Sequence, residues 1–216
     1  MTSMIRAGIA MLVLPMLTPI LMLWGAAGAW AQDLGKPLLL VARPSLQGPY
    51  SHTALIVVPV GERHIGFILN RSTGRTMGSV FPDHAPSKRV EDPVYFGGPE
   101  SADALFALLR RDPGRPSLHL FGDVYMTANG KSIDRIIEET PNDARYFAGF
   151  VGWRARELAA EIERGYWLVG EADAADVFRK DAGEALWEEL SKRLSGTGKA
   201  PRRPGEREAA LPLPVS

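Results

Sequence analysis

Short apolar runs bounded by glycine or proline form the clearest pattern along this chain. Runs of four to eight such residues are typical of buried β-strands. They predict strands at 38–42, 53–58, 65–69, 94–96, 118–121 and 166–169. The turn Val60-Gly61-Glu62-Arg63 separates the second run from the third, and it predicts a hairpin.

Helical periodicity lies between and after these runs. Ile133, Ile136 and Ile137 have the i, i+3, i+4 spacing of a buried helix face, and Ser132 before them is the predicted N-cap. Further helices are predicted over 104–109, from Leu158 to Gly165, over 173–178 and over 184–194, where Leu186, Leu190 and Leu194 share a face. Hairpin-linked strands with interspersed helices predict an α+β fold rather than a doubly wound sheet.

The first 31 residues have the pattern of a secretory signal peptide. Residues 7–24 carry no charge, and Ala29-Trp30-Ala31 matches the small-x-small pattern of a cleavage site before Gln32. We therefore expect export to the periplasm. Two alternatives stay open. The run is close to the ~20 residues that span a bilayer, which would make it an uncleaved membrane anchor. A misassigned start codon would leave the protein in the cytoplasm.

The remaining chain divides into one predicted domain and a tail. Residues 32–195 suit a single domain. Residues 196–216 are rich in proline, arginine and glutamate, so they bury too little apolar area to order themselves, and we expect them to be disordered.

Charge and cysteine content exclude several functional classes. Residues 1–31 contain only Arg6 among charged residues, so the mature chain carries 24 basic and 25 acidic residues. This near-neutral balance lacks the basic excess of nucleic-acid-binding proteins, and direct nucleic-acid binding is not expected. The absence of cysteine excludes disulfides, thiolate catalysis and thiolate metal sites.

Four sequence patches carry a resemblance to a known family. They are 39–46 with Tyr50 after it, Gly66 to Arg71, Val94 to Pro99, and Ala148 to Trp153 continuing through Gly165 and Trp167 to Trp187. In order and spacing they resemble the YqgE/AlgH family. Phe150 replaces the family's usual tyrosine, and Arg154-Ala155-Arg156 replaces a Gly-Pro-Gly-like turn.

The resemblance implies an α+β fold with a bifurcated mixed sheet, a small closed barrel portion and surrounding helices. It also implies an association with transcriptional regulation and no established catalytic mechanism. Family members generally lack the signal segment that this chain carries.

A ligand-binding surface is the functional site that we expect. Its predicted members are Arg43, Asn70, Arg71, Gly97, Gly98 and Trp153. Arginines at strand ends hold carboxylates or phosphates, and glycine amides cradle anions. Each also has a structural interpretation: Asn70 as a turn cap, Arg71 as the partner of an acid, the glycines as a tight strand exit, and Trp153 as core.

Catalytic and metal sites are weakly indicated. Ser45, Ser51, His52 and Asp123 supply hydrolase groups, but no Gly-x-Ser-x-Gly elbow is present. The four histidines show no metal-ligand spacing. We therefore expect no cofactor or metal. The leading hypothesis is an exported, non-enzymatic binding or regulatory protein with an unknown protein or small-molecule partner. The alternatives are a cytoplasmic transcription-associated regulator and an unrecognised hydrolase.

Overall fold

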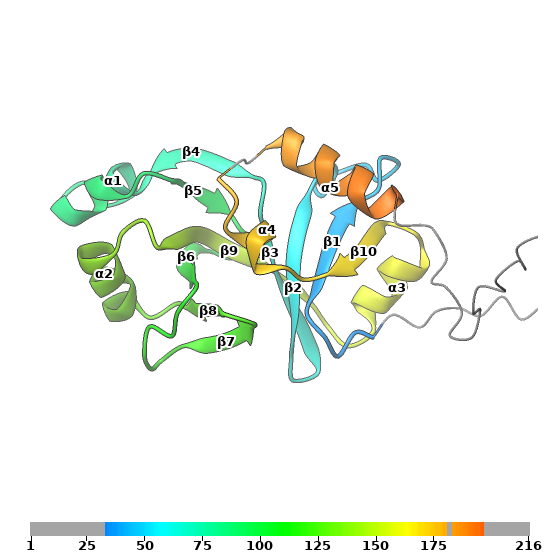
Figure 1. Ribbon diagram of the computed structural model, residues 1–216, viewed down its shortest axis with the longest axis horizontal. Helices are drawn as coiled ribbons and strands as arrows, with labels where there is room; N and C mark the ends of the chain where they lie inside the picture. The colour runs from blue at the N-terminus through cyan, green and yellow to red at the C-terminus, as the bar shows by residue number, and fades with distance from the viewer. Residues whose placement is uncertain (1–32, 181–182, 197–216) are drawn as a thin grey trace, which may run out of the picture. The chain divides into compact units, whose positions relative to one another are not determined.

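The computed structural model describes residues 33–180 and 183–196 of the 216-residue chain. These residues belong to one compact unit that begins at Asp33 (Figure 1). The predicted signal peptide and the predicted disordered tail, apart from Gly196, lie outside the described residues.

Ten strands form one branched sheet in this part of the chain. Their bounds are β1 Leu38–Ala42, β2 Ala54–Val60, β3 Arg63–Ile68, β4 Ser72–Thr76, β5 Pro93–Phe96, β6 Glu100–Leu109, β7 Leu118–Phe121, β8 Val124–Thr127, β9 Ala144–Trp153 and β10 Trp167–Glu171. The helices are α1 Met77–Val80, the 3-10 helix η1 Ala85–Arg89, α2 Gly130–Glu139, α3 Glu157–Glu163, α4 Ala174–Val177 and α5 Glu184–Gly196.

The branch point of the sheet is the long strand β9. The main path runs β10-β1-β2-β3-β9-β6-β8-β7, and β5 joins β9 in parallel while pairing with β4 on its other side. The antiparallel β2–β3 pair confirms the predicted hairpin. The curled antiparallel part forms a half-barrel with flanking helices, which confirms the α+β class.

The helices cover different parts of the sheet. Helices α3 and α5 pack on β10, and α5 also contacts β1 and β2. Helix α2 packs on β6, and α1 packs on β4 and η1. In Figure 1 these two groups lie on opposite sides of α4.

Strand β6 corrects one prediction. Residues 104–109 were expected to form a helix, but they are the second half of this strand. Phe106 and Leu108 face the core under α3 and α5, whereas Ala107 and Leu109 face the core under α2. Because both faces are buried, the run is apolar without alternation, and a pattern of this kind does not distinguish a strand from a helix.

The N-cap of α2 corrects a second prediction. Its buried stripe of Ile133, Ile136 and Ile137 is as expected, but the cap is Asn129, whose Oδ1 accepts a hydrogen bond from the backbone N–H of Ser132 over 3.1 Å. The helix therefore begins one turn earlier than predicted. Ser132 lies inside the first turn, and its hydroxyl also contacts the Asn129 side chain.

Candidate functional site

Two of the predicted ligand-binding side chains, those of Asn70 and Trp153, are packed into the interior. Asn70 is 5% exposed; its Oδ1 accepts from the Ala54 N–H over 3.0 Å, and its Nδ2 donates to the carbonyls of His52 and Gly183. Its side-chain polar atoms therefore join β2 to the segment that precedes α5. Trp153 is 4% exposed, and its indole N–H donates to Oε2 of Glu161 over 3.0 Å.

Gly97 and Gly98 lie against the backbone of β9. A Cβ atom at Gly97 would lie 2.2 Å from the carbonyl oxygen of Gly149, and one at Gly98 would lie 2.2 Å from the carbonyl carbon of Phe150. The Gly97 N–H already donates to the Ala148 carbonyl over 2.8 Å. The contacts of these glycines therefore match the structural interpretation, in which glycine permits close approach of two backbones.

Arg43 and Arg71 lie nearer the surface. Arg43 follows β1 and is exposed, while Arg71 is half-buried and donates to the Ser51 carbonyl over 3.3 Å. None of the six predicted residues lines the pocket where β6 ends and β9 begins. The two arginines stay a predicted anion-binding surface that the structure does not test.

The predicted hydrolase groups bond to other partners. His52 Nδ1 lies 3.0 Å from Glu184 and the ring stacks on Trp187, the Ser51 hydroxyl donates to Gly48, and Asp123 pairs with Arg110. These contacts hold turns and helix ends.

A Ser–His–Glu arrangement that the sequence did not indicate occurs near η1. His84 Nδ1 lies 2.8 Å from Ser87 Oγ, and His84 Nε2 lies 3.9 Å from Glu138. Ser87 has no exposed surface, so its hydroxyl cannot reach a substrate. The arrangement ties η1 together and joins it to α2.

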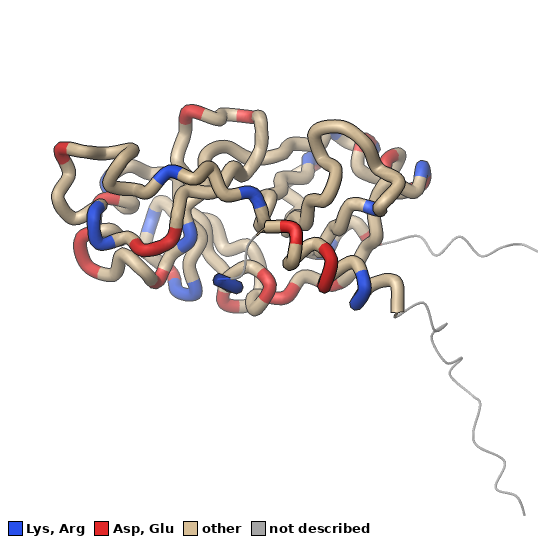
Figure 2. The backbone as a smooth tube through the Cα atoms, turned by 90° about the horizontal axis from the view of Figure 1, so that it is seen from above, with Lys and Arg blue, Asp and Glu red and all other residues tan. Residues whose placement is uncertain are grey.

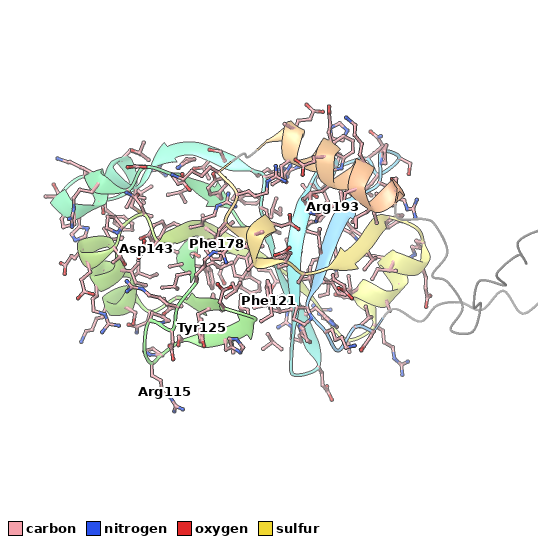
Figure 3. The ribbon with its side chains drawn as sticks, in the orientation of Figure 1. Arg115, Phe121, Tyr125, Asp143, Phe178 and Arg193 are labelled. Atoms are coloured by element: carbon pink, nitrogen blue, oxygen red, sulfur yellow. The ribbon has the colours of Figure 1, made fainter. Side chains whose placement is uncertain are left out.

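A pocket of about 410 Å³ opens where β6 ends and β9 begins. We call it the basic pocket, because its lining includes Arg110, Arg111, Arg145 and Lys180 against the two acids Asp92 and Asp143. Figure 3 labels Asp143, just before β9, and Phe178, just after α4, in this region. The volume lies within the ~300–1,000 Å³ range of small-molecule sites.

Arg145 is the unusual member of the basic pocket. It is 2% exposed, and no carboxylate among the described residues pairs with it. Its Nη1 and Nη2 donate to the carbonyls of Val177 and Leu69 over 2.6 and 3.1 Å, while its Nε is buried without a partner. The guanidinium also lies 3.9 Å from the centroid of the Tyr95 ring.

These contacts satisfy the two terminal nitrogens of the Arg145 guanidinium but do not cancel its charge. Carbonyl dipoles and an aromatic face stabilise a guanidinium, yet a buried ion is normally paired with an opposite charge. The positive field of Arg145 therefore extends into the pocket, where the low dielectric of the surrounding protein weakens it less than water would.

The other three cations are exposed and weakly paired. Arg110 lies 3.0 Å from Asp123, Arg111 lies 3.8 Å from Asp143, and Lys180 lies 3.9 Å from Glu91. Exposed pairs of this kind contribute about 0–1 kcal/mol each. Lys180 can therefore turn to an incoming anion at little energetic cost. Arg111 would exchange its hydrogen bond to the Thr140 hydroxyl, over 2.5 Å, for a contact with the anion, and Arg110 also lies over the Phe178 ring.

The sequence contains the charged residues of this site, but their spacing alone does not show that they lie together. The helix predicted over 104–109 places Arg110 and Arg111 after a helix, whereas in the structure they follow strand β6. Arg145 stands in Ala144-Arg145-Tyr146-Phe147, an apolar context in which a charged residue requires an explanation. Once β9 is known to be buried, that arginine marks the site.

The described part of the chain provides neither a metal-binding cluster nor a membrane-spanning helix. Within residues 33–180 and 183–196, no three His, Asp or Glu side chains gather into a set that could hold a metal ion. None of the helices in these residues is both long and apolar enough to cross a membrane. Basic and acidic positions are interspersed along the backbone (Figure 2).

Comparison with known proteins adds the family. A family model described as AlgH-like matches residues 39–199. A UPF0301 protein from Cytophaga hutchinsonii is 30% identical over 136 residues, covering 61% of this chain and 72% of the relative. One from Thermobifida fusca is 31% identical over 171 residues, covering 73% of this chain and 86% of the relative.

Two solved structures share the fold. The solution structure of AlgH from Pseudomonas aeruginosa matches with a TM-score of 0.62 at 24% identity, covering 77% of this chain and 90% of that protein. The crystal structure of a Corynebacterium diphtheriae protein matches with a TM-score of 0.59 at 23% identity, covering 74% and 86%. The family match and the shared fold agree over most of the described residues, and the chain therefore belongs to the AlgH-like, UPF0301 family.

Proposed function

We propose that this protein is an exported, non-enzymatic binding protein whose ligand is a small organic anion held in the basic pocket. The observation that carries the proposal is Arg145, a buried arginine without a carboxylate partner at a pocket that three exposed cations also line. An anion in the pocket supplies the missing negative charge. Arg111 and Lys180 contact it, and Arg145 acts through its field.

Export rests on the sequence of the first 31 residues. Their uncharged run and the Ala29-x-Ala31 pattern support a cleaved signal peptide. An envelope location favours a protein that binds a ligand or partner over one that contacts promoters, and the near-neutral charge of the chain is consistent with that preference.

The binding experiment uses ribose 5-phosphate as the probe, titrated by calorimetry into the protein at low salt. Binding is expected to weaken at least fivefold in Lys180→Gln and in Arg111→Gln, and to weaken as salt is raised. Lys192→Gln is the matched control. Like Lys180, this lysine is 80% exposed and pairs loosely with a glutamate, but it lies outside the pocket.

Two outcomes contradict the pocket. Failure of ribose 5-phosphate to bind would overturn the anion-binding proposal. Binding that Arg71→Ala abolishes and Lys180→Gln leaves intact would move the site to the surface predicted from the sequence. Arg145 itself is a poor test position, because its removal leaves the carbonyls of Val177 and Leu69 unsatisfied.

Export is tested separately by fractionating cells that produce a C-terminally tagged copy and measuring the intact mass. A periplasmic species that begins at Gln32 is the expected result. A full-length membrane species would show an anchor, and a soluble cytoplasmic species would restore the regulatory alternative. A negative broad hydrolase and phosphatase screen is expected, and turnover that purifies with the protein would restore the enzymatic one.

A further inference from the structure

The basic pocket also offers an aromatic face. Phe178 lines the pocket, is half-buried and packs on the core below. It comes directly after α4, the short helix whose last residue, Val177, accepts the hydrogen bond from Arg145. The buried cation and the ring are therefore held by neighbouring residues of one segment, so their relative position is fixed.

A flat group already covers this ring. The guanidinium carbon of Arg110 lies 4.8 Å from the centroid of Phe178, and Arg110 also lines the pocket. Guanidinium groups stack on aromatic faces much as planar rings do. The contact therefore marks a face of Phe178 on which a planar group fits, on the side of the pocket cations.

Arg110 holds this position weakly. It pairs with Asp123 at 3.0 Å, and both side chains are about half exposed, so the pair adds little stability. An incoming ring can take the place of the guanidinium on Phe178 or lie between the two. In either case Arg110 stays beside the ligand as a further cation.

The size of the pocket is consistent with a ligand larger than a bare anion. A volume of about 410 Å³ is far more than a single phosphate or carboxylate group needs, so the pocket has room for an organic body attached to the anion. The polar part of the lining carries four cations against two acids, and the apolar part includes an aromatic ring. This division suits a ligand that has a charged end and a flat end.

We propose that the ligand of the basic pocket is an aromatic phosphate of the mononucleotide type, with its ring stacked on Phe178 and its phosphate among Arg111, Lys180 and the field of Arg145. The inference rests on the proposed function, and it adds the chemical class of the ligand. Stacking of a base on an aromatic side chain is a general means of binding nucleotides without base-specific contacts.

The test compares adenosine 5′-monophosphate with ribose 5-phosphate, which lacks the adenine base. Both are titrated into the same protein. We expect the nucleotide to bind about tenfold more tightly, a value inside the range for base–aromatic stacking. In Phe178→Leu this advantage should shrink to threefold or less, while ribose 5-phosphate affinity stays within twofold. Phe81→Leu is the control, since Phe81 is exposed but lies outside the pocket.

A second measurement covers the case in which Phe178→Leu fails to fold. In the wild-type protein, nuclear Overhauser contacts are expected between the base protons of the bound nucleotide and the Phe178 ring, together with upfield shifts of those base protons. Their absence in a saturated sample would overturn the stacking inference.

The outcomes separate the two proposals. Equal affinity for both probes would overturn the aromatic ligand and leave anion binding in place. Failure of both probes to bind would overturn the anion-binding function itself. A nucleotide advantage that persists in Phe178→Leu would place the ring elsewhere and contradict the inference.

Discussion

The indole nitrogens of Trp153 and Trp167 donate hydrogen bonds to a single oxygen, Oε2 of Glu161, over 3.0 and 2.9 Å. Trp153 ends β9, Trp167 begins β10, and Glu161 lies in α3, which connects them. Both rings are buried. One carboxylate thus fixes the geometry of the whole β9–α3–β10 connection, and its loss would leave two buried donors without an acceptor.

Glu161→Ala is therefore expected to lower the free energy of unfolding by about 2–4 kcal/mol, because hydrogen bonds to a charged group are lost and two indole N–H groups stay buried. Urea denaturation followed by tryptophan fluorescence measures this change. Glu163→Ala is the control, since Glu163 is exposed on the same helix and should change stability by no more than about 0.5 kcal/mol. Equal midpoints for the two variants would contradict the assignment.

Substitution of Asn70 tests whether this residue has a structural or a ligand-binding role. Asn70→Ala removes hydrogen bonds to Ala54, His52 and Gly183, the first of them fully buried, and should lower the free energy of unfolding by about 2–4 kcal/mol. Chemical denaturation checks the result against Ser51→Ala, in the loop of His52, where the hydroxyl bonds to the Gly48 carbonyl of the same turn. A variant of wild-type stability that loses ligand binding would instead support the surface predicted from the sequence.

Gly97→Ala tests the close approach of β5 and β9. The added methyl group would lie 2.2 Å from the carbonyl oxygen of Gly149, so the two backbones must separate. We expect the loss of about 3 kcal/mol or more, seen as a sharply lower melting temperature or insoluble protein. At Gly130, the first residue of α2, a methyl group meets no atom within 4 Å, and alanine should be neutral or stabilising. Unchanged melting of Gly97→Ala would show that the turn adapts.

The buried hydroxyl of Tyr146 is expected to make stability depend on alkaline pH. Burial, followed by the charge of Asp143, raises the pKa of its hydroxyl well above the ordinary value of 10.0. The folded state therefore keeps the proton after the unfolded state has lost it. The contribution of this group is complete below the unfolded pKa and is lost as pH rises from about 10 toward the folded pKa.

Tyr146→Phe should therefore flatten the decline of unfolding free energy between pH 9 and pH 11. At pH 7 the variant should lose about 1 kcal/mol, because the hydroxyl donates to the Pro141 carbonyl over 3.1 Å. Denaturation at a series of pH values measures both effects. The exposed Tyr166→Phe provides the comparison. Parallel pH profiles for wild type and Tyr146→Phe would exclude Tyr146 as the source of the decline.

Local sequence determined those elements whose stability is decided within a short span. The apolar runs at β1, β2 and β3 and the turn between the last two specify a hairpin-linked set of strands, because burial favours them and the turn residues fix the connection. The isoleucine stripe of α2 likewise marks a buried helix face. The four family patches, which follow one another in order, identified the α+β fold and the AlgH-like family.

Only the tertiary structure decided the character of β6, β9 and the basic pocket. The run Ala104 to Leu109 suits a helix by composition, and it becomes a strand because β8 and β9 pair with it and cores cover both of its faces. The buried charge of Arg145 is held by the carbonyls of Leu69 and Val177, which are distant from it in sequence. Local propensities are worth tenths of a kcal/mol per residue, whereas burial of a strand or of an unpaired charge involves several kcal/mol. Contacts between distant residues therefore decided the conformation of β6 and the environment of Arg145.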